Sequence, residues 1–220
     1  MGKKYGRLIT IEGAEGCGKS THARLLYNYL KRHGYKCILT REPGGTPLNE
    51  KIRNILLDPS NRGMNPICEM LLFEASRSVL VEKVILPALS EGYLVICDRY
   101  SDSTLVYQGY AGNQDLKTLR LIDRYATRGV RPDLTIVLDI PVKAGLKRAR
   151  NGATRRKKVF KWDRMERKSL SFHKAVRRGY LALATREKGR IKVIRSQADI
   201  GEAQRMIRQT VLRLIRNHKV

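Results

Sequence analysis

The stretch that decides the fold is Leu8-Ile-Thr-Ile-Glu-Gly-Ala-Glu-Gly-Cys-Gly-Lys-Ser-Thr21. An apolar, β-branched run ends at Glu12, and Gly13–Ser20 follows with the spacing G-x-x-x-x-G-K-S. Such a loop surrounds a phosphate chain with backbone N–H groups, and the helix that follows points its N-terminus at the anion. The run before the loop predicts a buried strand, and the pattern after it predicts an amphipathic helix over about 19–33. These features favour binding of a nucleoside triphosphate over a plain glycine-rich turn.

The residues of this loop have distinct expected roles. The glycines let the backbone approach the phosphates, Lys19 reaches the β and γ oxygens, and the Ser20 hydroxyl suits Mg²⁺. The predicted ATP-binding set is Gly13, Ala14, Glu15, Gly16, Cys17, Gly18, Lys19, Ser20 and Thr21.

Short apolar runs alternate with helical patterns along the rest of the chain. The runs lie at 7–12, 37–41, 93–98, 134–139 and 191–194, and helices are predicted near 19–33, 47–57, 66–90, 115–128, 142–150, 166–187 and 200–217. This alternation predicts an α/β fold whose parallel sheet is covered on both faces, with ligands at the carboxyl ends of the strands.

Charged residues stand where several of these strands end. Asp98 closes the third run, so its carboxylate can orient Mg²⁺ or its waters opposite Ser20, and Arg99 would lie where phosphates meet. The alternative is a surface salt bridge at a strand end. Arg41 leaves the second strand in Thr40–Thr46, a glycine-bearing turn, and is expected either to hold a second phosphate or to be an ordinary surface arginine.

Two helical segments can supply a base pocket. The first begins at Asn65-Pro66, a good cap and first turn, and carries Phe73 and Arg77 on one face. A ring can stack on a base while arginine donates to its carbonyls, although a residue such as Phe73 taken alone is more often part of the core. In the second segment Thr104, Tyr107 and Gln108 share a face at helical spacing.

Composition limits the remaining possibilities. The chain has 220 residues and 42% hydrophobic content, enough for one core, and no apolar run reaches the ~18 residues of a membrane span. Its four cysteines are scattered without metal-ligand spacing, so a reducing cytoplasm is the expected location. We therefore expect a single domain over 1–220.

The charge is high and unevenly placed. The net charge is +25, of which residues 1–142 contribute +5 and residues 143–220 contribute +20. Such a half can bind nucleic acid, or it can be a solvated basic face on an enzyme with anionic substrates. The phosphate-binding loop favours the second interpretation. Residues 151–163 are charge-dense, begin with the turn dipeptide Asn-Gly and are expected to form a mobile flap.

Five motifs in this order resemble the bacterial-type thymidylate kinase family. They are Glu-Gly-x-x-Gly-x-Gly-Lys-Ser, Thr-Arg-Glu-Pro-Gly-Gly-Thr, Leu-Phe-Glu-Ala-Ser-Arg, Asp-Arg-Tyr-x-x-Ser-Thr-x-x-Tyr-Gln-Gly and Arg-Pro-Asp-Leu-Thr. The resemblance implies a doubly wound, five-stranded parallel sheet, a lid at about 150–166, Mg²⁺ dependence, a homodimer, and conversion of dTMP to dTDP with ATP.

The resemblance also assigns residues to the dTMP site. It implies that Phe73 stacks on thymine, that Arg77 reaches its carbonyl edge, and that Tyr107 packs against the sugar and excludes a 2′-hydroxyl. The full implied set is Glu12 near the sugar and Mg²⁺, Arg41 and Arg99 on the phosphate, and Phe73, Arg77, Thr104, Tyr107 and Gln108 around the nucleoside.

The catalytic arginine is expected to come from the lid, because Ala14-Glu15 supplies none in the loop. The candidates are Arg150, Arg155, Arg156 and Arg164. The last lies within Asp163-Arg-Met-Glu166, which looks like the family's lid-closing segment, and Arg155 or Arg156 is favoured. The catalytic set is thus Lys19, Arg99 and one of these arginines, and the metal ligands are Ser20 and Asp98. Two rivals stay open: a kinase for another nucleoside monophosphate, and a nucleic-acid-binding protein whose loop only senses nucleotide.

Overall fold

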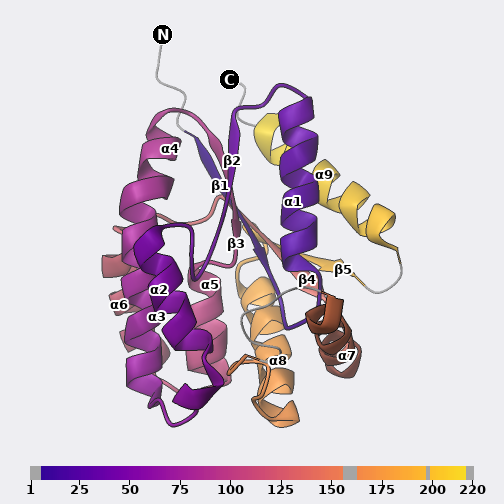
Figure 1. Cartoon of the computed structure of the whole chain (residues 1–220). Coiled ribbons are helices and arrows are strands. Elements are labelled where there is room, and N and C mark those ends of the chain that lie inside the picture. The colour runs from indigo at the N-terminus through magenta and orange to yellow at the C-terminus, as the bar shows by residue number, and fades with distance from the viewer. Residues whose placement is uncertain (1–5, 156–162, 197–198, 217–220) are drawn as a thin grey trace.

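The computed structural model describes residues 6–155, 163–196 and 199–216, with side chains omitted at 152–155. This part of the chain contains one five-stranded sheet in the order β2-β3-β1-β4-β5, and every neighbouring pair is parallel (Figure 1). The strands are β1 (Arg7–Glu12), β2 (Cys37–Arg41), β3 (Leu94–Asp98), β4 (Leu134–Asp139) and β5 (Ile191–Arg195). The five predicted strands and their parallel arrangement are confirmed.

Helices connect the strands and cover both faces of the sheet. They are α1 (Lys19–Arg32), α2 (Pro47–Leu57), α3 (Pro66–Leu80), α4 (Leu86–Ser90), α5 (Ser101–Thr104), α6 (Leu116–Ala126), α7 (Val142–Arg155), α8 (Leu170–Arg186) and α9 (Ile200–Arg216), with a 3₁₀ turn η1 (Pro59–Asn61) and two π-helical segments, η2 (Val81–Ile85) and η3 (Leu105–Tyr110).

Each face of the sheet has its own core. On one face, α1 and α9 pack side by side through residues such as Leu26 and Ile207 against Ile9 and Ile11 of the central strand (Figure 1). On the other face, the α3–η2–α4 segment packs on Leu8 and Val95, while α8 and η3 pack around Val137. This two-sided burial is the doubly wound architecture expected from the alternating pattern.

Local signals explain most helix boundaries. The Asn65 side chain accepts from the Cys68 N–H at 2.8 Å and begins α3, and Ser169 accepts from the Phe172 N–H and begins α8 later than predicted. The predicted helix over 66–90 is continuous but changes to the wide π turn η2 just before Pro87. Proline has no N–H to close a regular turn, so a wider turn is accommodated there.

The segment that begins at Asn151 differs from its predicted structure. Asn151 and Gly152, expected to form a turn, lie inside α7, because the helical pattern of 142–150 continues. The flap predicted at 151–163 is partly outside the described residues, at 156–162. The helical spacing of side chains within 103–108 was the one indication in the sequence of the helix that α5 and η3 form.

Among the described residues, no helix has the length and apolarity needed to cross a membrane.

Candidate active site

A cavity of about 590 Å³ lies at the carboxyl ends of the strands. Its walls come from the loop after β1, the start of α1, the β2–α2 connection, α2, α3, the end of β3 with α5 and η3, α7, and the segment before α8. These segments are far apart in sequence, and the parallel sheet brings them to one edge.

The phosphate-binding loop forms one end of this cavity. Gly13, Gly16 and Gly18 all have positive φ, which a side chain disfavours, and a Cβ on Gly16 would lie 1.9 Å from the Gly145 carbonyl oxygen of α7. The Lys19 ammonium lies within the loop, donating to the Gly13 carbonyl at 3.0 Å and the Ala14 carbonyl at 2.8 Å. The loop is therefore closely packed against α7, with its lysine at the cavity wall.

The predicted metal ligands lie together. The Ser20 hydroxyl donates to an Asp98 carboxylate oxygen at 2.5 Å, and both residues line the cavity. Hydroxyl and carboxylate oxygens suit Mg²⁺, which commonly takes few protein ligands and completes its shell with water and phosphate oxygens. Among the described residues, no group of three or more His, Cys, Asp or Glu is placed to hold a metal ion.

Arginines surround the middle of the cavity. Arg41 lines it and pairs with Glu50 at 2.9 Å, and Arg99 donates to Glu15 at 2.7 Å while its guanidinium lies 4.9 Å from the centre of the Tyr107 ring. Sequence reasoning missed Arg53, which lines the same wall and donates to the Pro43 carbonyl at 2.8 Å. Its position one helical turn after the buried Asn49 is the signal that could have identified it.

Glu15, predicted to contact ATP, also contacts two residues predicted for the dTMP site, Arg99 and Tyr107. Its carboxylate accepts from Arg99 and from the Tyr107 hydroxyl at 2.8 Å, so it joins the loop to η3. Burial opposes ionisation of this carboxyl, but the Arg99 and Lys19 charges outweigh burial and lower its pKa to about 2. Glu15 is therefore an anion between the phosphate-binding loop and the predicted acceptor pocket.

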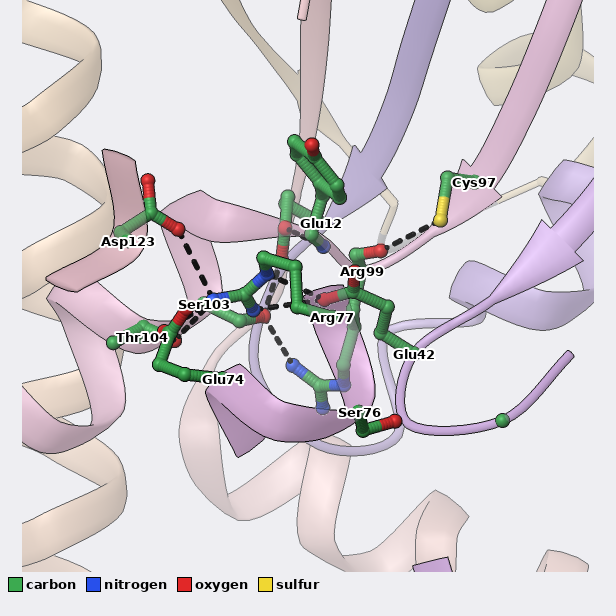
Figure 2. A network of polar contacts seen from close by, with 12 residues as sticks. Glu12, Glu42, Glu74, Ser76, Arg77, Cys97, Arg99, Ser103, Thr104 and Asp123 are labelled. Carbon is green, nitrogen blue, oxygen red and sulfur yellow. Dashed lines mark hydrogen bonds and ion pairs between the residues drawn. The ribbon is translucent and has the colours of Figure 1, made fainter. Parts of the chain in front are cut away.

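The aromatic–guanidinium pair predicted on α3 lines the opposite end. Phe73 is half-buried at the cavity wall, which favours the pocket interpretation over a core position. Arg77 lies at the centre of a buried polar network, with Glu74, Thr104 and Asp123 around one end of its guanidinium and Glu42 at the other (Figure 2). We call Arg77 and its partners Glu42, Glu74, Thr104 and Asp123 the Arg77 cluster.

The geometry of the Arg77 cluster fixes the arginine fork. Nε and Nη2 lie 2.9 and 2.8 Å from one oxygen of Glu42, while Nη1 donates to Glu74, to Thr104 at 2.8 Å and to Asp123 at 3.1 Å. Burial raises the pKa of Glu42 to about 8 although Arg77 opposes the shift, and burial raises that of Asp123 to about 6. At neutral pH Glu42 therefore retains a proton that an isolated carboxyl would lose, whereas Asp123 is mostly ionised.

The other predicted base contacts are also held by acids of α3. The Thr104 hydroxyl donates to Glu74 at 2.8 Å, and the Gln108 amide donates to Glu69 at 2.8 Å. Both side chains line the cavity next to Tyr107. The structure thus brings together Phe73, Arg77, Thr104, Tyr107 and Gln108, as predicted.

The chain is similar to known proteins over most of its length. The family model described as thymidylate kinase matches residues 11–207. The chain belongs to the thymidylate kinase family. It is 46% identical over 200 residues to a thymidylate kinase from Desulfosudis oleivorans (90% of this chain, 94% of that protein) and 48% identical over 203 residues to one from Symbiobacterium thermophilum (92% and 91%). A crystal structure of thymidylate kinase from Ehrlichia chaffeensis is 31% identical with a TM-score of 0.75, covering 94% of this chain and 99% of that one.

Two residues that the thymidylate kinase resemblance assigned to the site, Glu12 and Arg164, do not line the cavity. Glu12 is fully buried and accepts from the Tyr100 N–H, the Ser103 hydroxyl and the Tyr180 hydroxyl, each at 2.7 Å. Its side chain does not line the cavity itself, although its partner Ser103 does, and burial raises its pKa. Glu12 thus joins β1 to α5 and α8, and its place near the sugar and Mg²⁺ stays a prediction.

Arg164 is likewise part of the protein framework of this thymidylate kinase family member. It is buried, donates to the Leu56 carbonyl at 2.8 Å and pairs with Glu69, so its guanidinium does not line the cavity. In this position Arg164 does not face the cavity, and its catalytic role stays a prediction. Arg156 lies outside the described residues, as does the Arg155 side chain, whereas Arg148 of α7 lines the cavity and donates to the Ser196 carbonyl at 3.0 Å.

Proposed function

We propose that this chain transfers the γ-phosphoryl group of ATP to dTMP, giving ADP and dTDP. The observation that carries the proposal is one cavity lined at one end by Lys19 of the phosphate-binding loop and at the other by Phe73 and Arg77. An anion-binding loop and a base pocket separated by arginines suit two nucleotides placed with their phosphates together. Membership in the thymidylate kinase family supports thymine as the base.

The acceptor is already an anion, so the reaction needs no general base. Positioning and charge neutralisation then supply most of the rate enhancement. Lys19 and the loop N–H groups hold the ATP phosphates, and Arg41, Arg53 and Arg99 hold the dTMP phosphate. Ser20 and Asp98 would hold Mg²⁺, which supplies charge neutralisation at the phosphate oxygens when bound.

Recognition of thymine follows from the fixed arginine fork. A guanidinium has five N–H bonds, and the contacts of Arg77 within the described part of the chain leave one N–H of Nη2 for a ligand. That donor suits a pyrimidine carbonyl, while Phe73 stacks on the ring. Tyr107 is held by Glu15 and contacts the Phe172 and Tyr180 rings edge-on, so it is a rigid wall against the sugar.

The segment 150–166 is proposed as a lid that closes on ATP and excludes water. We favour Arg155 or Arg156 as its catalytic arginine, and Arg148 is a cation already at the cavity wall. Single changes of these three arginines to Met, followed by single-turnover rates, assign the role. Loss of an arginine of this type is expected to lower the rate by about 10³-fold or more.

Exposed apolar residues support the proposed homodimer. Leu48, Ile55, Ile67, Leu71, Leu121 and Tyr125 of α2, α3 and α6 are 47–78% exposed, and these three helices pack together. Exposed apolar residues on neighbouring helices are typical of an interface. Light scattering is expected to give a dimer, and Tyr125→Asp is expected to give a monomer. The free cysteines agree with the cytoplasm as the proposed location.

Steady-state assays with dTMP, dUMP, dCMP and AMP test the proposed function. We expect dTMP to be preferred, and dUMP to be weaker because a methyl group supplies only ~1–3 kcal/mol of discrimination. Phe73→Ala is expected to raise the KM for dTMP with little change in the KM for ATP. Equal or faster turnover of dCMP or AMP would instead support a kinase for another nucleoside monophosphate.

A further inference from the structure

The exposed side of α1 and α9 carries a dense group of cations outside the cavity. The two helices lie side by side on one face of the sheet (Figure 1). Arg24 of α1 is exposed but lines the cavity. The other exposed basic residues of the two helices, with one from the turn after α1, are Lys31, Arg32, Lys36, Arg205, Arg213 and Arg216. We call these six residues the α1–α9 basic face.

Almost no acidic residue offsets this charge. Residues 19–41 contain no Asp or Glu, and in α9 Glu202 of the first turn is the one acid. No ion pair joins the six cations to a carboxylate side chain in the part of the chain that the structure describes. The ranges left out contain no Asp or Glu, so none of their side chains can supply a carboxylate partner. The positive field of this surface is therefore directed to solvent.

Aromatic rings lie among these cations. Tyr27, Tyr29 and Tyr35 are half-buried at the same surface, and the Arg208 guanidinium lies 4.5 Å from the centre of the Tyr29 ring. The centres of the exposed His33 ring and the Tyr29 ring are 4.1 Å apart. Partly exposed rings between unpaired cations are the combination by which proteins hold bases and phosphates of a nucleic-acid strand.

The position of the face separates it from the kinase reaction. α1 starts at the phosphate-binding loop and runs back to the amino edge of the sheet, where the end of α9 also lies (Figure 1). Four of the six cations, Lys31, Arg32, Arg213 and Arg216, belong to these last turns. Binding of ATP or dTMP in the cavity therefore gives no account of them.

We propose that the α1–α9 basic face binds RNA, with the six cations on backbone phosphates and the tyrosines against bases. An anionic membrane fits the surface less well, since a membrane-bound helix also presents an apolar strip, and the large exposed apolar residues of α9 are only Ile200 and Met206. This inference does not depend on the proposed reaction.

Fluorescence anisotropy of a labelled oligouridylate at several KCl concentrations tests the proposal in the full chain. The test variant is Lys31→Gln/Arg32→Gln/Arg213→Gln/Arg216→Gln. The control, Arg62→Gln/Lys83→Gln/Lys117→Gln/Arg128→Gln, removes the same charge from exposed residues elsewhere. Kinase turnover checks that both variants are folded, since neither set lines the cavity.

We expect the test variant to lose about tenfold or more of the RNA affinity at low salt, with the slope of log K against log[KCl] reduced by up to about 3. We expect the control to change the RNA affinity by less than about twofold. In the unmodified chain and in the control, saturating ATP and dTMP should not displace bound RNA. Equal losses in both variants, displacement by the nucleotides, absence of RNA binding, or binding to anionic vesicles but not to RNA would each overturn the proposal.

Discussion

The Arg77 cluster and the α1–α9 basic face use arginine in opposite environments. In the cluster, one guanidinium that is 2% exposed has three carboxylate partners; on the face, six exposed cations have none among the described residues. A buried charge is tolerated only with partners that compensate for lost hydration, whereas an exposed charge keeps its water and projects its field. The charge of Arg77 is therefore compensated within the protein, whereas the charges of the basic face are available to an external anion.

The largest expected effect comes from removing the buried cation. Arg77→Met leaves Glu42, Glu74 and Asp123 without their shared partner, and should lower the free energy of unfolding at neutral pH by about 3–5 kcal/mol. Arg213→Met on the basic face should change it by less than about 0.5 kcal/mol. Urea denaturation measures both values, and similar losses would remove the contrast between the two regions.

Glu42→Gln tests whether the cluster holds a proton. Because the pKa of Glu42 is raised from 4.5 to about 8, the folded state binds a proton that the unfolded chain releases, and the stability it contributes is lost as pH rises between those values. The slope for one proton is at most about 1.4 kcal/mol per pH unit. Denaturation across this range should show the slope in the unmodified chain and a reduced slope in the variant; an unchanged slope would assign the proton elsewhere.

The Arg41–Glu50 pair is an intermediate case. Its side chains are 52% and 43% exposed, so water screens the attraction. A double-mutant cycle of Arg41→Gln and Glu50→Gln should give a coupling energy of about 0.2–1 kcal/mol. A coupling energy as large as that of a buried pair would show that the exposed fraction of an ion pair does not determine its strength.

The smallest effect is expected on the basic face. Its cations repel one another, so Arg213→Gln/Arg216→Gln should raise stability by a few tenths of a kcal/mol at low salt. The gain should vanish near molar KCl, where charges are screened within about 3 Å. Thermal unfolding at both salt concentrations measures it, and destabilisation at low salt would show that these arginines have favourable partners.

The fold was predictable because its signals are local. Apolar runs, Asn65-Pro66 and the glycine loop each determine structure within a few residues, and the five strands appear where they were expected. The site was predictable where a motif places a residue at a strand end, as with Ser20 and Asp98. The Phe73 and Arg77 wall was inferred from helical spacing and is also observed.

The contacts that the sequence did not indicate join partners distant in the sequence. Arg164 pairs with Glu69, which is 95 residues away, and Glu12 bonds to Tyr180, 168 residues away. No local pattern shows that an acid at a strand end will point into the interior, or that a lid-like arginine will be buried against α3. The direction of Glu15 similarly depends on Arg99 and on the backbone of η3.

The wide turn of η3 has a consequence for attempts to stabilise this protein. A π turn contains one residue more than a regular helix of the same path and has poorer backbone bonding, and Tyr107 and Gln108 both belong to it. Deleting one residue there would restore regular winding but rotate one of the two side chains out of the cavity. A change that makes this helix more regular would therefore also disrupt the wall of the cavity. The π turn keeps Tyr107 and Gln108 at that wall at the expense of helix regularity.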